Sequence, residues 1–379
     1  MRSLKAAREV CEKFHPGLLA ELEALPRAER EAAGSPVVEI YRRHGGPGLL
    51  VPAEHGGHAA GPLAAVRVQR ALGAASPSLG VATVMHHFTV AMLFSLAGTA
   101  ERLTPAQRKV LGAVAGDGLL LASGWAEGRT EQNILAPAVV AERVPGGYRV
   151  NGTKKPCSLS RSMDVLTASV AVTDPDGRTS LALLLIPAGS PGISVEPFWR
   201  APVLAAAQSE TVRLADVDVP EDLVIRSTPE DHDRLDDLQT AGFTWFELLT
   251  TACYTGAASA LVERVLTAGR GTAAERAELA VRAEAAVALV EGAARAIAGG
   301  VSGDEAVAAV LVARYQVQDL LGRAVDQAVE MLGGIAFIGS PDVVQLAASV
   351  RALAFHPPSR SSAAAGLAGY FAGEPLRLS

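Results

Sequence analysis

The stretch 121–225 is the most informative part of the chain for the fold, because its pattern of apolar residues differs from that of the rest. It opens with the small-residue turn ASGWAEG at 122–128 and continues with GGYRVNGTK at 146–154. Alternating apolar runs follow within 165–186, and the stretch closes on TVRLADVDVP at 211–220. Short apolar runs separated by turns rich in Gly, Pro and Asp are typical of β-strands. The pattern predicts a compact β-domain set between two helical regions.

Apolar residues recur at helical spacing on both sides of this stretch. After it come three long periodic segments separated by Gly-containing breaks, 245–266, 273–298 and 303–331, and a fourth, 341–354, that precedes Pro357-Pro358. This arrangement predicts an α+β chain of three domains. We expect an all-α domain at 1–118, a β-barrel at 119–225 and a four-helix bundle at 226–379.

Composition excludes several classes of function. The net charge is −6, so the chain has no basic footprint for nucleic acid or for an acidic membrane surface. The longest apolar run, 79–98, contains His86 and His87, which favours a buried core helix over a membrane span. We therefore expect no nucleic acid and no membrane among the partners.

The cysteines predict a reducing compartment. Cys11, Cys157 and Cys253 are far apart and odd in number, which argues against a disulfide framework and against a zinc site. The charged segment 1–14 has no apolar core of the kind that signal peptides carry. The expectation is a cytoplasmic protein without a metal site.

Three short motifs carry a resemblance to a known family. They are LVPAEHGG at 50–57, DVDVP at 216–220 and LGGIAF at 332–337. In order and spacing they resemble the leucine-x-proline-glutamate loop, the β-domain exit and the double-glycine turn of acyl-CoA dehydrogenases. The resemblance covers essentially the whole chain. It implies the fold of that superfamily, with a helical domain, a β-barrel and a four-helix bundle.

The resemblance also implies a flavin, FAD with FMN as the alternative, where the barrel meets the bundle. The residues placed at the cofactor by this resemblance are Trp125, Ala126, Cys157, Ser158, Gly333 and Gly334. Ser158 is either a donor to the flavin or a turn serine that follows Pro156. The double glycine lets the backbone approach a pyrophosphate, or it merely ends a helix. Glu330 replaces the family's glutamine, and a carboxylate near a pyrophosphate is unfavourable.

The catalytic base is where the sequence departs from the family. Pro357 occupies the position of the usual glutamate, and proline cannot exchange a proton. A second group of family members places the base on the first bundle helix, which favours Glu247 here. Alignment on Gly256 instead puts Phe246 at that position, and the alternative for Glu247 is a first-turn residue facing solvent.

Further residues are expected in the substrate pocket. His87 is a candidate because the resemblance places its helix along the acyl pocket of the family, and Phe246 is a candidate because it aligns with the base of the second group. For the histidine pair at 86–87 we expect one buried, hydrogen-bonded ring and one at the surface.

These observations leave three functions open. The favoured prediction is flavin-dependent α,β-dehydrogenation of an acyl thioester carried on CoA or a carrier protein, with Glu247 as base. The second is a flavin monooxygenase or N-hydroxylase of the same superfamily, which takes reduced flavin from a reductase and needs no such base. The third is a non-catalytic relative. The resemblance further implies a homodimer or homotetramer, a small-molecule substrate, and an electron-transfer partner or flavin reductase.

Overall fold

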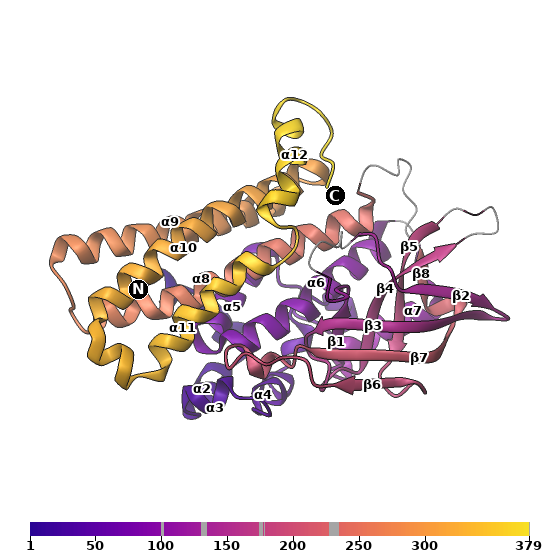
Figure 1. Ribbon diagram of the computed structural model, residues 1–379, viewed down its shortest axis with the longest axis horizontal. Helices are drawn as coiled ribbons and strands as arrows, with labels where there is room; N and C mark the ends of the chain where they lie inside the picture. The colour runs from indigo at the N-terminus through magenta and orange to yellow at the C-terminus, as the bar shows by residue number, and fades with distance from the viewer. Residues whose placement is uncertain (100–101, 130–134, 174–176, 178, 227–234, 379) are drawn as a thin grey trace.

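The computed structural model describes residues 1–99, 102–129, 135–173, 177, 179–226 and 235–378, and its arrangement is shown in Figure 1. Helices at both ends of the sequence form one elongated body, and the strands lie together at the right of the view. The predicted fold class is confirmed, with a helical region, a central sheet and a second helical region in that order.

The N-terminal region is helical up to Gly116. Its helices are α1 (Arg2–Phe14), α2 (Leu18–Ala24), α3 (Arg27–Glu31), α4 (Val37–Arg43), α5 (Pro62–Ala75), α6 (Pro77–Thr99) and α7 (Pro105–Gly116), with short 3-10 turns η1 (Gly46–Gly48) and η2 (Ala53–His55). Thr104 is the N-cap of α7 and forms a reciprocal capping box with Gln107, which satisfies two otherwise unpaired backbone donors.

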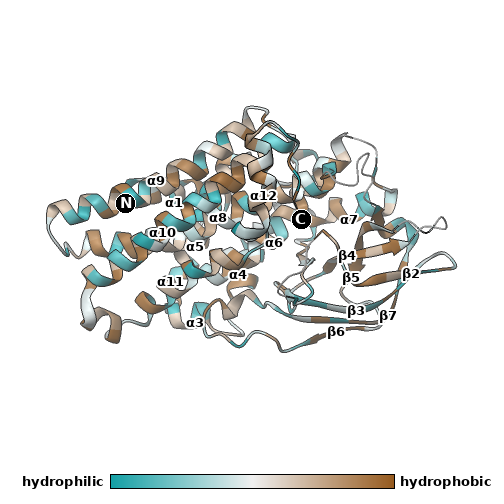
Figure 2. Cartoon of the chain, turned by 45° about the horizontal axis from the view of Figure 1, so that its top comes forward, coloured by the Kyte–Doolittle hydropathy of each residue, from teal (hydrophilic) through white to brown (hydrophobic). Residues whose placement is uncertain are grey.

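The strands form one sheet. They are β1 (Leu121–Gly124), β2 (Val140–Val144), β3 (Gly147–Cys157), β4 (Val165–Thr173), β5 (Thr179–Pro187), β6 (Ile193–Glu196), β7 (Glu210–Pro220) and β8 (Val224–Arg226), with 3-10 turns η3 (Ala205–Ala207) and η4 (Glu221–Leu223). Their order is β6-β7-β3-β2-β4-β5-β8, and β1 pairs in parallel with β4. Strands β4 and β5 are buried along almost their whole length, which explains their near-continuous apolar sequence, visible as brown ribbon in Figure 2.

The C-terminal region contains the predicted bundle and one helix more. Its helices are α8 (Asp237–Thr267), α9 (Ala273–Ala298), α10 (Gly303–Gly339), α11 (Pro341–Arg351) and α12 (Arg360–Phe371), with the 3-10 turn η5 (Ala352–Phe355). Helix α10 continues past the predicted end at Met331, although Gly333 interrupts it with φ 80° and ψ 168°. Helix α12 was not predicted, and Ser359 caps it by accepting a hydrogen bond from the Ser362 amide.

Helix α6 lies at the centre of the molecule. Within it, Pro77–Gly98 has the length and composition of a membrane span, but 83% of its apolar window is buried inside the protein. It packs against α5, α8 and β1, so it joins the bundle to the sheet. This agrees with the interpretation of the apolar run as a core helix.

Two glycines allow α5 and α8 to approach closely. A Cβ on Gly73 would lie 2.0 Å from the Cys253 carbonyl oxygen, and a Cβ on Gly256 would lie 2.0 Å from the Arg70 carbonyl oxygen. Backbone cannot yield as a flexible side chain can, so a methyl group here forces the helices apart.

Replacing Gly256 by alanine is therefore expected to lower the free energy of unfolding by about 1–3 kcal/mol. The matched control is Gly292→Ala in α9, where a Cβ meets no atom within 4 Å. That variant should gain up to about 1 kcal/mol from reduced backbone entropy in the unfolded chain. Chemical denaturation of both variants checks the pair, and equal effects would contradict the close-packing account.

Candidate functional site

The predicted cofactor residues of the β-domain come together where the sheet meets α6. The Lys155 amide donates to the Ala126 carbonyl at 2.8 Å, which ties the segment after β1 to the end of β3. The Leu159 amide donates to the Ala207 carbonyl at 3.0 Å, and η3 in turn packs against α6. The structure thus gathers Trp125, Ala126, Cys157 and Ser158 at one end of the sheet, beside the central helix.

Their side chains differ in what they offer. The Ser158 hydroxyl lies 2.9 Å from the Ser209 hydroxyl and is 7% exposed, so it is an ordered hydrogen-bonding group. The buried Trp125 Nε1 has no hydrogen-bond partner within the described residues, although an indole N–H normally finds one. Burial raises the pKa of the Cys157 thiol to about 12, so this cysteine is neutral and unsuited to act as a nucleophile.

A buried ion pair, which the sequence pattern did not predict, lies beside these residues. Lys154 Nζ lies 2.7 Å from Glu127 Oε1 and also donates to the Ser169 carbonyl. Glu127 accepts the amides of Ala138 and Val139 at 2.9 and 3.1 Å, so it also fixes the residues just before β2. Burial alone would raise the pKa of Glu127, but these donors outweigh it and leave the pKa lowered.

Strand alternation contains a signal for this pair. Lys154 shares a face of β3 with the buried Val150, because alternate residues of a strand point the same way. A lysine at a core-facing position requires a carboxylate partner, which sequence spacing alone cannot identify as Glu127.

An aromatic cluster lies on the helical side. The Phe246 ring meets Phe88 of α6 at 5.4 Å and His356 at 5.7 Å between ring centroids, both edge to face. His356 Nε2 is hydrogen-bonded to the Tyr254 hydroxyl at 2.8 Å. Burial, followed by the charge of Arg314, lowers the pKa of His356 to about 3, so the ring is neutral near pH 7. The predicted pocket residue Phe246 therefore lies among aromatic and neutral polar groups.

The histidine pair at 86–87 has a structural explanation. The Leu121 amide donates to His86 Nδ1, which makes Nε2 the proton-bearing nitrogen that donates to the Pro47 carbonyl, each at 3.0 Å. His87 Nε2 bonds to the Tyr41 hydroxyl, and Tyr41 donates onward to the Gly46 carbonyl. Both rings are fully buried, so the prediction that one lies at the surface is wrong. The Nε2 of His87 is occupied by this network.

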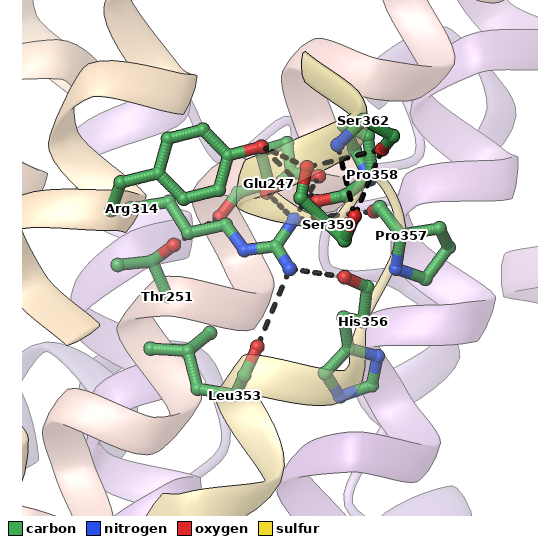
Figure 3. Close-up of polar contacts among 10 residues, drawn as sticks. Glu247, Thr251, Arg314, Leu353, His356, Pro357, Pro358, Ser359 and Ser362 are labelled. Atoms are coloured by element: carbon green, nitrogen blue, oxygen red, sulfur yellow. Dashed lines mark hydrogen bonds and ion pairs between the residues drawn. The ribbon is translucent and has the colours of Figure 1, made fainter. Parts of the chain in front are cut away.

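The predicted base, Glu247, is fully buried and bound to an arginine (Figure 3). Arg314 Nη1 lies 2.8 Å from both carboxylate oxygens, and its other nitrogen donates to the carbonyls of Leu353 and His356. Burial raises the pKa of Glu247 to about 7, and Arg314 limits that rise. The solvent-facing alternative is wrong, and the carboxylate is held in a structural network rather than left free to accept a substrate proton.

Gly333 and Gly334 lie elsewhere. They follow Leu332 near the α10–α11 turn, which Figure 1 shows at the end of the bundle far from the strands. A single chain does not bring them together with Trp125 and Ser158, so their predicted contact with the cofactor stays a prediction.

The described residues contain no cluster of three or more His, Cys, Asp or Glu side chains that could hold a metal ion.

The chain is similar to proteins of known activity. The family model described as acyl-CoA dehydrogenase, N-terminal domain, matches residues 3–111. The isobutylamine N-hydroxylase of Streptomyces viridifaciens is 59% identical over 378 residues, which span 100% of both chains.

Solved structures agree in fold. The structure of KijD3 in complex with FMN and dTDP-3-amino-2,3,6-trideoxy-4-keto-3-methyl-D-glucose has a TM-score of 0.84 at 21% identity and covers 97% of this chain and 94% of that one. The nitrososynthase of Micromonospora carbonacea var. africana has a TM-score of 0.82 at 23% identity and covers 98% of both chains.

These similarities correct the favoured functional prediction. Dehydrogenation of an acyl thioester is wrong, because the full-length relative at 59% identity is an amine N-hydroxylase. The geometry agrees, since the carboxylate expected to take the α-proton is occupied by Arg314. Of the three functions that the sequence left open, the flavin monooxygenase or N-hydroxylase of the same superfamily is therefore better supported.

Proposed function

Since this chain belongs to the family of the isobutylamine N-hydroxylase, within the acyl-CoA dehydrogenase superfamily, we propose that it hydroxylates the nitrogen of a small aliphatic primary amine. The reaction consumes the amine, O₂ and a reduced flavin, and it yields the N-alkylhydroxylamine, oxidised flavin and water. One oxygen atom enters the N–O bond, and the two electrons and two protons of the reduced flavin convert the other to water. A separate reductase using NAD(P)H supplies the reduced flavin.

The observation that supports this chemistry most strongly is the buried ion pair between Glu247 and Arg314. Removing an α-proton needs a carboxylate that is free to accept it. Oxygenation of an amine nitrogen instead uses the lone pair of the substrate, so no such base is required. The Glu247–Arg314 pair is compatible with the second reaction and unsuited to the first.

The residues beside α6 fit a flavin. The Trp125 indole offers a buried N–H that has no acceptor among the residues that the structure describes, and Ser158 offers an ordered hydroxyl. A flavin ring carries carbonyl and ring-nitrogen acceptors that can take both donors, and Ala126 presents no bulky side chain against a ring face. The bound flavin would supply the electrons that activate O₂. Trp125, Ala126, Cys157 and Ser158 would hold it, and FMN and FAD share the ring that these residues would contact.

The aromatic cluster suits the amine. The apolar faces of Phe88 and Phe246 can pack against a short alkyl chain, and His356 is neutral at the working pH. An apolar surrounding disfavours an ammonium ion and so favours the neutral amine, whose lone pair is needed for attack on oxygen. We infer that these three residues bind the alkylamine.

The assay combines the purified protein, a flavin, a flavin reductase, NAD(P)H and air with primary amines of graded chain length. Isobutylamine is expected to give its hydroxylamine, detected by mass spectrometry. Phe246→Ala should reduce kcat/KM for this four-carbon amine roughly tenfold relative to a six-carbon amine, since a longer chain refills the vacated space. The matched control is Phe371→Ala, an exposed residue at the end of α12, which should change neither value. If Phe246→Ala kept the wild-type ratio of kcat/KM for the four-carbon and six-carbon amines, Phe246 would not line the amine pocket.

A further inference from the structure

Helix α8 carries a row of side chains on the face that borders the aromatic cluster. Phe246, Thr250 and Tyr254 follow one another at intervals of four residues, so successive side chains differ in direction by about 40° around the helix axis. The rings of Phe246 and Tyr254 lie 5.7 and 5.5 Å from the ring of His356, measured between centroids. Phe246 also contacts Phe88 of α6. Thr250 stands between the two aromatic residues, so its side chain points toward the space that α6 and His356 border.

The hydroxyl of Thr250 does not bond to its own helix. A threonine inside a helix commonly donates to the carbonyl four residues earlier. Thr251 donates to the Glu247 carbonyl at 2.6 Å, and Thr255 donates to the Thr251 carbonyl at 2.7 Å. The hydroxyl oxygen of Thr250, in contrast, is buried and has no hydrogen-bond partner among the residues that the structure describes. Its side chain therefore adopts the orientation that turns the hydroxyl away from the preceding carbonyl.

A buried hydroxyl without a partner is unfavourable by itself. Thr250 is only 2% exposed, so bulk water does not replace the missing partner. The nearest polar groups on this face are already engaged, since the Tyr254 hydroxyl and His356 Nε2 bond to each other at 2.8 Å. Valine has nearly the shape of threonine and would fill the same position without this cost. The hydroxyl is thus a single available polar group in an apolar surrounding, which is the kind of group that orients a small ligand.

We propose that the hydroxyl of Thr250 binds the nitrogen of the amine substrate. This role rests on the proposed function and deepens it, because the aromatic rings bind the alkyl chain but do not orient the nitrogen. A hydroxyl oxygen accepts hydrogen bonds through its lone pairs, and a neutral primary amine has two N–H donors. When Thr250 accepts one of these N–H groups, the lone pair of the nitrogen stays free to attack oxygen. The alkyl chain then packs against Phe88 and Phe246.

The test compares Thr250→Val with the wild type in the hydroxylation assay described above. KM for isobutylamine should rise roughly tenfold and kcat should stay within about twofold, because the lost hydrogen bond already exists in the bound substrate. Thr250→Ser keeps the hydroxyl and should remain closer to the wild type than Thr250→Val. The matched control is Thr255→Val, a buried threonine of the same helix whose hydroxyl is occupied by its own backbone, and KM should not change in it.

Two further measurements separate binding of the nitrogen from a structural role. Isopentane carries a methyl group where isobutylamine carries its amino group, so its inhibition constant should be the same in the wild type and in Thr250→Val. The urea midpoint of Thr250→Val should not fall, because the free protein loses no hydrogen bond.

The outcomes distinguish this role from the proposed function. A wild type that forms no hydroxylamine would refute the proposed function itself. With an active wild type, three results would each overturn the role of Thr250 alone: equal KM values in Thr250→Val and Thr255→Val, equal weakening of isopentane and isobutylamine, or a lower urea midpoint in Thr250→Val.

Discussion

Replacing Arg314 by methionine is expected to lower the free energy of unfolding by about 3–5 kcal/mol. The substitution leaves the fully buried carboxyl of Glu247 without its cation. It also removes the donors that hold the carbonyls of Leu353, His356 and Pro357, and these fix the segment leading into α12. Equilibrium denaturation in urea measures the loss.

The double variant Glu247→Leu with Arg314→Met should recover much of that stability, because it removes both members of the buried pair. Arg323→Met is the matched control, since Arg323 lies on the same helix but is exposed. Its effect should fall within about 0.5 kcal/mol. If Arg314→Met resembled this control, the pair would have no structural importance, and Glu247 would return as a candidate base.

The histidines with lowered pKa values predict a second large effect, a loss of stability in mild acid. Burial lowers the pKa of His15 and His86 to about 4 and that of His356 to about 3. In the unfolded chain these rings titrate near 6.5, so below that pH the unfolded state binds more protons than the folded state. Each ring then lowers the free energy of unfolding by about 1.4 kcal/mol per pH unit as the pH falls from 6.5 toward 4.

Together the three rings should lower the free energy of unfolding by about 4 kcal/mol per pH unit in that window. His87, whose pKa is also lowered by burial, adds to this decrease. Glu247 acts in the opposite sense, because its raised pKa makes the folded state bind a proton first, but it is one group against four. Thermal unfolding between pH 7.5 and 5 checks this, with His86→Asn as the variant that should flatten the slope. A midpoint constant across that range would show that the imidazoles are not neutral and buried.

Local pattern was sufficient to predict the fold. The turns at Gly146-Gly147 and the alternation along β3 specify a strand without knowledge of its neighbours, and the long periodic segments specify α8 to α11. The errors in the predicted helices also have local causes. Gly333 suggested a helix end but produced only a kink, and the Ser- and Ala-rich segment of α12 carries too weak a periodicity to be recognised after Pro357-Pro358.

The site was less predictable, because its decisive contacts join distant parts of the chain. Arg314 and Glu247 are 67 residues apart, and Lys154 and Glu127 are 27 apart. The sequence shows each as a charge within an apolar pattern, which indicates that a partner exists but not which one. For the same reason Glu247 could be identified as conspicuous, while its role depended on the arginine that reaches it.

The most direct test of the proposed reaction is the fate of molecular oxygen labelled with oxygen-18. The protein, a flavin reductase, NAD(P)H, flavin and isobutylamine are incubated under the labelled gas, and the hydroxylamine is analysed by mass spectrometry. The proposed amine oxygenation predicts one labelled oxygen atom in the N–O bond of each product molecule. Unlabelled product, or anaerobic bleaching of the flavin by an acyl thioester without any amine product, would contradict it.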